Sequence, residues 1–303
     1  MIQPLKHLCV RIVIPHFFNP GLCGDAVGSG FGARQSDTLS RSCSLFQCLR
    51  SIYNLRRSVV NSQLLIRNRS IEPLQASVYM GSIVDRIDFE VIVCVYRDLF
   101  LKDVLSLFPF VKIVDCSSDI SAPNQLGIAA RDLLLKSQPV AGLSVYTEDD
   151  LVIHDPLFFD KLVQFFGAFG HQYVLMPHRY EVDQRINVHS RLYVDGPIDA
   201  SAYRTWHQPE LNHAMWKIPS LIDCEISLDA PENPHAGFFA VSAQQVSELL
   251  DNRHQWPRDG FISPLETAAT YTVGKFFKIL KVSMEYQNFF CVEHSCPSYL
   301  AYI

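Results

Sequence analysis

The sequence contains no run of apolar residues long enough to cross a membrane. The apolar stretch near the amino terminus, residues 8–14, is interrupted by Arg11 and followed by Pro15. A membrane-spanning helix needs about 20 predominantly apolar residues in succession. No targeting signal is visible either. We therefore expect a chain without a transmembrane segment.

Paired cysteine motifs are also missing. The nine cysteines include no Cys-x-x-Cys pair, and their number is odd. This pattern indicates neither a zinc framework nor a complete set of disulfides. We therefore expect reduced thiols and a cytoplasmic protein.

The sequence has no excess of basic residues and no established phosphate-loop motif. Its formal net charge of −5 argues against a nucleic-acid binder that works by general electrostatic attraction, although it is compatible with a local basic patch, so we expect no nucleic-acid partner. Residues 21–32 hold five of the fourteen glycines, but their spacing matches neither a dinucleotide nor a P-loop fingerprint. That loop is equally consistent with close approach to a ligand and with simple flexibility.

Apolar residues are abundant, at 48% of the 303 residues, and they recur in alternating strand and helix patterns. This alternation predicts a single α/β domain with a mostly parallel central sheet flanked by helices. The expected strands cover residues 10–18, 89–96, 110–115, 143–146 and 173–177, and the expected helices cover residues 38–55, 99–108, 126–135 and 156–169.

Two segments have no clear periodicity. Residues 56–87 predict a loop-rich insertion, and residues 199–229 predict a long loop or a substrate-facing excursion. Local patterns elsewhere are clearer. The helix at 38–55 is expected to bury an apolar face, and Ser242 with Gln245 forms a capping box. The expected buried face consists of Leu39, Cys43, Phe46, Leu49 and Tyr53.

Three consecutive carboxylates follow the strand at residues 143–146. Glu148, Asp149 and Asp150 are thereby expected at its carboxyl end, where open α/β sheets bind their ligands. Adjacent acids repel one another, and a hard divalent cation relieves that repulsion. Mg²⁺ or Mn²⁺ held by one or two carboxylates usually shares its other positions with substrate phosphates. The alternative is a solvated acidic turn.

Two arginines flank the start of the helix at 38–55. Arg34 and Arg41 could meet a diphosphate, and the alternative is that both are ordinary surface residues. His178, at the end of the strand at 173–177, is a weaker candidate for a metal ligand.

With these segments in order, the chain resembles the nucleotide-sugar glycosyltransferases of the GT-A fold. The resemblance rests on Tyr146–Asp150, on Ala236–Phe239, on Glu266 and on His294. It implies a single GT-A-like, Rossmann-like domain over residues 1–303. Residues 1–150 would then form a nucleotide-binding half, and residues 151–303 an acceptor-binding half.

The resemblance also implies roles for individual residues. Glu148 and Asp150 would bracket Mn²⁺ or Mg²⁺ on the donor diphosphate, and His294 would complete the coordination. Asp149 could hydrogen-bond the ribose or the donor sugar. Gly237 would line the acceptor side, and Glu266 would be an acceptor ligand or the general base. We accordingly expect His294 and Asp150 to approach each other within the span of one metal ion.

The implied activity is metal-dependent transfer of a sugar from a nucleoside diphosphate sugar to a hydroxyl of a carbohydrate or another acceptor. Two other functions fit parts of the pattern: a metal-dependent phosphoesterase or nucleotidyltransferase, and a non-catalytic carbohydrate-binding relative. Single residues also have simpler explanations. Glu266 is the capping partner expected for Ser263, Gly237 could merely permit strand packing, and His294 could be an isolated histidine.

Overall fold

The computed structural model describes residues 5–20, 38–58, 61–74, 81–138, 140–183, 190–208, 213–218 and 224–302. Within these ranges, no helix combines the length and the apolar character needed to span a bilayer. The glycine-rich residues 21–32 and the candidate diphosphate ligand Arg34 lie outside the described residues.

A five-stranded sheet forms the centre of the molecule, with the strand order β13-β6-β1-β4-β5. Four strands run parallel, and β13 pairs antiparallel with β6 at one edge. The sheet confirms the predicted α/β fold with a mostly parallel central sheet flanked by helices. Its strands are β1 (Leu5–Pro15), β4 (Val84–Val95), β5 (Val111–Asp115), β6 (Leu143–Thr147) and β13 (Phe238–Ser242).

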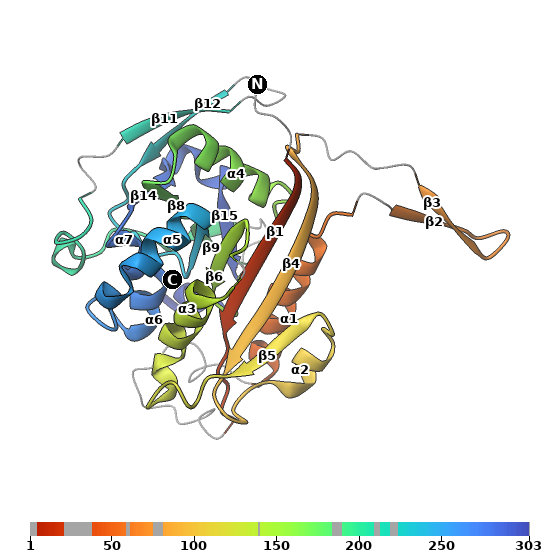
Figure 1. The fold of residues 1–303 in the computed structure, drawn as a ribbon, viewed down its shortest axis with the longest axis horizontal. Helices are drawn as coiled ribbons and strands as arrows, with labels where there is room; N and C mark the ends of the chain where they lie inside the picture. Colours follow the sequence, from red (N-terminus) through yellow and green to blue (C-terminus); the bar gives the residue numbers. More distant parts are fainter. Residues whose placement is uncertain are drawn as a thin grey trace.

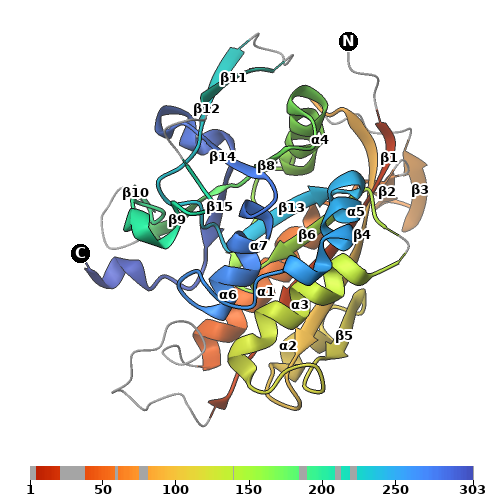
Figure 2. The same ribbon diagram turned by 60° about the vertical axis from the view of Figure 1, so that its left-hand side comes forward.

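Helices cover both faces of this sheet (Figure 1). The helix α1 (Thr38–Asn54) connects β1 to β4, and α3 (Leu126–Lys136) leads from β5 back to β6, so right-handed connections place these two helices on opposite faces. The helix α5 (Ala243–Asp251) packs beside α3 (Figure 2). Its N-cap, Ser242, forms the predicted capping box with Gln245.

The prediction for the buried face of α1 is wrong except at Leu49. Leu39, Phe46 and Tyr53 are exposed, and Arg41, Ser44 and Ser51 are among the residues buried in their place. The buried face also contains Leu45, Cys48 and Ile52, and its polar residues pack against the acidic segment and the strand that follows it. Ser51 Oγ accepts a hydrogen bond from the backbone N–H of Ile153 at 3.2 Å.

The helix α2 (Lys102–Ser106) is shorter than the predicted helix at 99–108. A turn at residues 97–98 precedes it, residues 99–101 are not helical, and the backbone N–H of Leu101 donates to His16 Nε2 at 3.1 Å. The helix α4 (Phe158–Phe169) corresponds to the helix predicted at 156–169, and it buries Phe158, Leu162 and Phe165.

The strand predicted at residues 173–177 does not belong to the central sheet. It forms β8 (Tyr173–Leu175), which pairs with β14 (Lys278–Val282) in a second sheet of order β11-β12-β14-β8. The edge of the central sheet next to β6 is occupied by β13, which leaves no position there for β8. A third sheet contains β7 (Leu151–Val152), β9 (His178–Asp183), β10 (Ser190–Tyr193) and β15 (Cys291–His294).

Both segments predicted to lack regular structure contain hairpins. β2 (Asn61–Leu65) pairs with β3 (Ser70–Leu74), and this hairpin projects away from the rest of the molecule (Figure 1). β11 (His213–Ile218) pairs with β12 (Cys224–Asp229). The side chains of β2 and β3 are largely exposed, so no buried face imposed an alternating pattern on their sequence.

Short helical turns complete the chain. Glu266 ends α6 and is followed directly by a π-helical segment, η7, which leads into α7. The bounds of these turns are α6 (Pro264–Glu266), η7 (Thr267–Tyr271), α7 (Thr272–Gly274), η3 (Pro123–Gln125), η4 (Ala200–Ala202), η6 (Arg253–Gln255), η8 (Met284–Phe289) and η9 (Tyr299–Tyr302).

Candidate functional site

The candidate site lies where the strand order of the central sheet reverses. From β1 the chain proceeds outward to β4 and β5, and it then returns to the other side of β1 as β6. The carboxyl ends of β1 and β6 therefore flank the switch point, which is the ligand-binding position of open α/β sheets. His16 follows β1, and Glu148, Asp149 and Asp150 follow β6.

Asp149 is anchored within the protein. Its Oδ2 accepts hydrogen bonds from His16 Nδ1 and from Arg41 Nη2, both at 2.5 Å. Because His16 Nε2 accepts from Leu101, Nδ1 carries the proton that is donated to Asp149. Burial alone would raise the pKa of Asp149, but the charge of Arg41 and the hydrogen bond from His16 outweigh this effect and lower the pKa. Asp149 thus fixes the acidic segment to β1 and α1, and its expected contact with a sugar stays a prediction.

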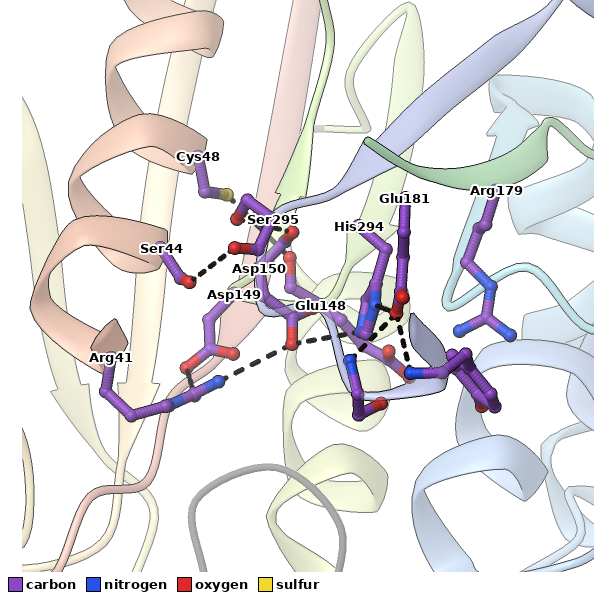
Figure 3. Close-up of polar contacts among 12 residues, drawn as sticks. Arg41, Ser44, Cys48, Glu148, Asp149, Asp150, Arg179, Glu181, His294 and Ser295 are labelled. Atoms are coloured by element: carbon purple, nitrogen blue, oxygen red, sulfur yellow. Dashed lines mark hydrogen bonds and ion pairs between the residues drawn. The ribbon is translucent and has the colours of Figure 1, made fainter. Parts of the chain in front are cut away.

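Glu148 and Asp150 have oxygen atoms without partners. Asp150 Oδ2 lies 3.5 Å from Arg41 Nη1 and 3.5 Å from His294 Nε2, whereas Asp150 Oδ1 is buried with no hydrogen bond (Figure 3). Glu148 Oε1 is also buried without a hydrogen bond, and His235 Nε2 is 4.0 Å away from it. Buried polar atoms in native proteins are almost always paired, so these two oxygens indicate a position for a ligand.

The two carboxylates differ in electrostatic environment. Burial, and then the charge of Asp150, raise the pKa of Glu148 above its ordinary value. The pKa of Asp150 is lowered because His294 and Arg41 outweigh the opposing effect of burial. Burial alone would lower the pKa of His294, but Asp150 together with Glu181 raises it to about 10. The protonated imidazole of His294 therefore supplies a positive charge beside Asp150.

Strand pairing brings His294 to the acids. His294 lies opposite Leu151 in the β15–β7 pair, and the backbone N–H of Ser295 donates to the carbonyl of Asp150 at 2.8 Å. His294 Nδ1 is 2.9 Å from Glu181 Oε1. The predicted approach of His294 to Asp150 is confirmed, across 144 residues of sequence. Its role as a metal ligand stays a prediction.

Gly237 packs directly against Glu148. The backbone N–H of Glu148 donates to the carbonyl of Gly237 at 2.9 Å, one residue before β13 begins. Gly237 has a φ of +59°, and a Cβ added there would lie 2.6 Å from Glu148 Oε2. The backbone conformation therefore favours glycine, and a side chain at this position would displace the Glu148 carboxylate.

Glu266 accepts a hydrogen bond from Ser263, the N-cap of α6, and also lies near the acids. Ser263 Oγ donates to Glu266 Oε2 and accepts from the backbone N–H of Leu265 at 3.2 Å. After burial and Asp150, the charge of Glu266 also contributes to the raised pKa of Glu148. The π-helical segment η7 begins at the next residue, and such segments are frequent at functional sites. The role of Glu266 as a base stays a prediction.

Sequence reasoning did not assign Arg179 to the site. Figure 3 shows its guanidinium on the side of Glu148 opposite to Arg41. Asp195 Oδ1 accepts from Arg179 Nε at 2.9 Å and from Nη2 at 2.8 Å. Burial alone would lower the pKa of Arg179, but the charge of Asp195 and then that of Glu148 raise it. A polar run at the end of an apolar strand, residues 178–181, was the available signal for this residue.

His178 does not support a metal-binding role. Its Nε2 lies 2.6 Å from the backbone carbonyl of Val282, to which it donates a hydrogen bond. Burial and the charge of Lys281 lower the pKa of His178 to about 4. The imidazole is therefore a neutral structural donor between β9 and β14.

The donor atoms at the switch point fit a divalent cation only in part. Across the ranges that the structure describes, no group of three or more His, Cys, Asp or Glu side chains forms a metal cage. The unpartnered oxygens of Glu148 and Asp150 are nevertheless hard ligands of the kind that Mg²⁺ and Mn²⁺ take. Mg²⁺ commonly binds through one or two carboxylates and fills its shell with water and phosphate oxygens.

Comparisons with known proteins give only distant structural similarity. No family model matches the chain, and no curated protein sequence matches it. Residues 1–349 of TarS from S. aureus superpose with a TM-score of 0.41 at 10% identity, over 91% of this chain and 58% of that one. The 4-diphosphocytidyl-2C-methyl-D-erythritol synthase of Anaerococcus prevotii superposes with a TM-score of 0.36 at 9% identity, over 91% and 87%. Neither similarity assigns a function.

Proposed function

We propose that the protein is a metal-dependent glycosyltransferase that moves a sugar from a nucleoside diphosphate sugar to an acceptor hydroxyl. The observation that carries the proposal is the pair of buried, unpartnered oxygens on Glu148 and Asp150 at the switch point of the sheet. Their position suits a ligand that brings its own positive charge, which a metal–diphosphate complex does.

In this proposal Glu148 and Asp150 hold Mn²⁺ or Mg²⁺ against the donor diphosphate. The bound metal supplies Lewis-acid stabilisation of the charge that develops on the leaving diphosphate. Arg41 contacts Asp149 and Asp150 and so holds the acidic segment in place. Arg179, on the other side of Glu148, adds a fixed positive charge that favours an anionic leaving group.

Glu266 is the proposed general base for the acceptor hydroxyl. The Ser263 hydroxyl and the helix start of α6 hold its carboxyl group in one orientation. Glu266 is half-buried, so an acceptor that enters from solvent can reach it. Because Gly237 has no side chain, the Glu148 carboxylate can occupy the space beside it.

An assay of the intact chain with a panel of nucleoside diphosphate sugars and Mn²⁺ tests the function. We expect release of nucleoside diphosphate from at least one donor, and loss of that release when Asp150 is changed to Asn. Asp155→Asn is the matched control, because Asp155 is the nearby acid that accepts from the backbone N–H of Leu157 and that Asn can replace.

Other outcomes would replace the proposal. Release of pyrophosphate from nucleoside triphosphates indicates a nucleotidyltransferase, and phosphate release from unrelated esters indicates a phosphoesterase. Binding of a carbohydrate with no turnover of any donor indicates a non-catalytic protein.

A further inference from the structure

A second candidate site lies outside the carboxylate cluster, on the outer side of α3. A pocket of about 450 Å³ opens between the second half of α3 and the turn that follows α5. It is unusual for this protein because the lining is basic, whereas the whole chain carries a net charge of −5. The side chains used below are Arg131, Asp132, Lys136, Arg253, Trp256 and Arg258.

One carboxylate is shared among three cations in this pocket. Asp132 Oδ1 accepts from Arg131 Nε at 2.9 Å, and Asp132 Oδ2 lies 3.3 Å from Lys136 Nζ and 3.8 Å from Arg258 Nη2. Arg253 lines the same pocket and adds a further positive charge. The pocket therefore has a local excess of positive charge, which an anion would relieve.

The floor of the pocket is fixed before any ligand binds. Arg131 is only 1% exposed, and its Nη1 donates to the carbonyl of Pro257 at 2.5 Å and to Thr272 Oγ1 at 2.9 Å. The ring of Trp256 has Arg131 Cζ at 5.4 Å and Lys136 Nζ at 5.8 Å from its centroid, and Trp256 Nε1 donates to the carbonyl of Leu249 at 2.9 Å. The buried guanidinium and the indole thus form a rigid base.

The rim of the pocket is exposed and cationic. The side chains of Lys136 and Arg258 are 56% and 71% exposed, and Arg253 is exposed as well. Exposed arginines that can reorient above a fixed base suit an oxyanion with several acceptor oxygens, since guanidinium groups bind phosphate in a bidentate manner. The negative charge of a diphosphate also matches the excess of cationic over anionic side chains in the pocket.

This pocket is separate from the carboxylate cluster. Gly127, in the first turn of α3, packs against Leu265 and the hydroxyl of Tyr146, next to the acids. Arg131 and Lys136 lie four and nine residues further along the same helix. At the helical rise of about 1.5 Å per residue, this corresponds to roughly 6 and 14 Å along α3.

We propose that this pocket is a binding site for a diphosphate-bearing ligand, distinct from the site at the carboxyl edge of the sheet. The recognition elements are the guanidinium groups of Arg253 and Arg258 and the ammonium group of Lys136 above the Arg131–Trp256 base. Nothing in this inference depends on the glycosyltransferase activity proposed above.

Calorimetric titration of the intact chain with inorganic pyrophosphate, in EDTA, tests the inference. We expect binding that weakens at least tenfold in the double variant Arg253→Ala/Arg258→Ala and that also weakens as salt is added. The matched control is Lys102→Ala/Lys112→Ala, which removes the same charge from exposed positions on α2 and β5. Thermal unfolding verifies that each variant is folded.

Three results would overturn the inference. Absence of pyrophosphate binding at millimolar concentration removes the site. An equal loss in the Lys102→Ala/Lys112→Ala control shows general attraction to surface charge. A loss in Asp150→Asn, with none in the pocket variant, places the pyrophosphate at the carboxylate cluster. Parallel titrations with a nucleoside diphosphate and with pyrophosphate distinguish whether a nucleoside adds to the recognition, for example by contact with Trp256.

Discussion

Two buried carboxylate sites in this molecule differ in how completely their oxygens are paired. Asp160, in α4, accepts hydrogen bonds from the backbone N–H groups of Ile83 at 2.8 Å and Val84 at 3.0 Å, from Ser82 Oγ, and from Arg57 through both of its oxygens. Glu148 and Asp150 are also buried, yet each has an oxygen with no hydrogen bond. Burial alone therefore does not distinguish the two sites, whereas the unpaired buried oxygens make Glu148 and Asp150 the candidates for ligand binding.

The comparison assigns different consequences to similar substitutions. At Asp160 the protein supplies every partner, so the expected effect is on stability. At the switch point the protein leaves partners out, so the expected effect is on ligand binding.

The largest effect on stability is expected for Asp160→Asn. It leaves the buried Arg57 guanidinium without its counter-charge, and breaking a buried ion pair in this way costs about 3–5 kcal/mol. Urea unfolding followed by circular dichroism measures the change. A loss below about 1 kcal/mol would remove the distinction between the two sites.

A smaller combined effect is expected for Gly237→Ala. The substitution forces a side chain into a left-handed backbone conformation, at about 1–2 kcal/mol, and displaces the Glu148 carboxylate. We expect donor turnover to fall more than tenfold while the protein remains folded. Turnover equal to that of the unchanged protein would show that Glu148 need not occupy its present position.

Glu148→Gln is expected to leave stability unchanged or raised by up to about 1 kcal/mol, since it relieves repulsion between buried carboxylates. Thermal unfolding in EDTA at pH 7 measures this. Destabilisation as large as that of Asp160→Asn would contradict the contrast, because it would mean that Glu148 is a structural acid.

The smallest effect is expected for Asp155→Asn. Asn still accepts from the backbone N–H of Leu157, and only a partly exposed ion pair with Lys161 is lost, for about 0–1 kcal/mol. Unfolding free energy and donor turnover should both match the unchanged protein. A clear loss of turnover would extend the site beyond Glu148, Asp149 and Asp150.

Local patterns in the sequence predicted local structure well. The buried strand β6 and the acids at its end, and the Ser242–Gln245 capping box of α5, follow from residues within a few positions of one another. The buried face of α1 could not be predicted in this way, because Arg41 and Ser44 are buried by contacts with residues more than a hundred positions away. The hairpin β2–β3 lacked a regular alternation that would have indicated it. Apolar and polar residues do alternate in β12, from Cys224 to Asp229, and this signal was missed because the surrounding residues show no clear period.

Within the site, the positions of the residues were easier to predict than their hydrogen-bond partners. The approach of His294 to Asp150 came from the family resemblance, and the structure shows it. The sequence did not indicate that His16 and Arg41 would engage Asp149 while Asp150 Oδ1 stayed without a partner. These differences among three adjacent acids depend on which distant element each side chain meets.

The most direct test is calorimetric titration of a nucleoside diphosphate in the presence and absence of Mn²⁺, with the unchanged protein and with Asp150→Asn. Asp150 is buried and lies near both Arg41 and His294, so the folded state of the variant is verified first. The account predicts Mn²⁺-dependent binding by the unchanged protein and a loss of that dependence in the folded variant. Nucleoside diphosphate binding by folded Asp150→Asn with unchanged Mn²⁺ dependence would contradict it.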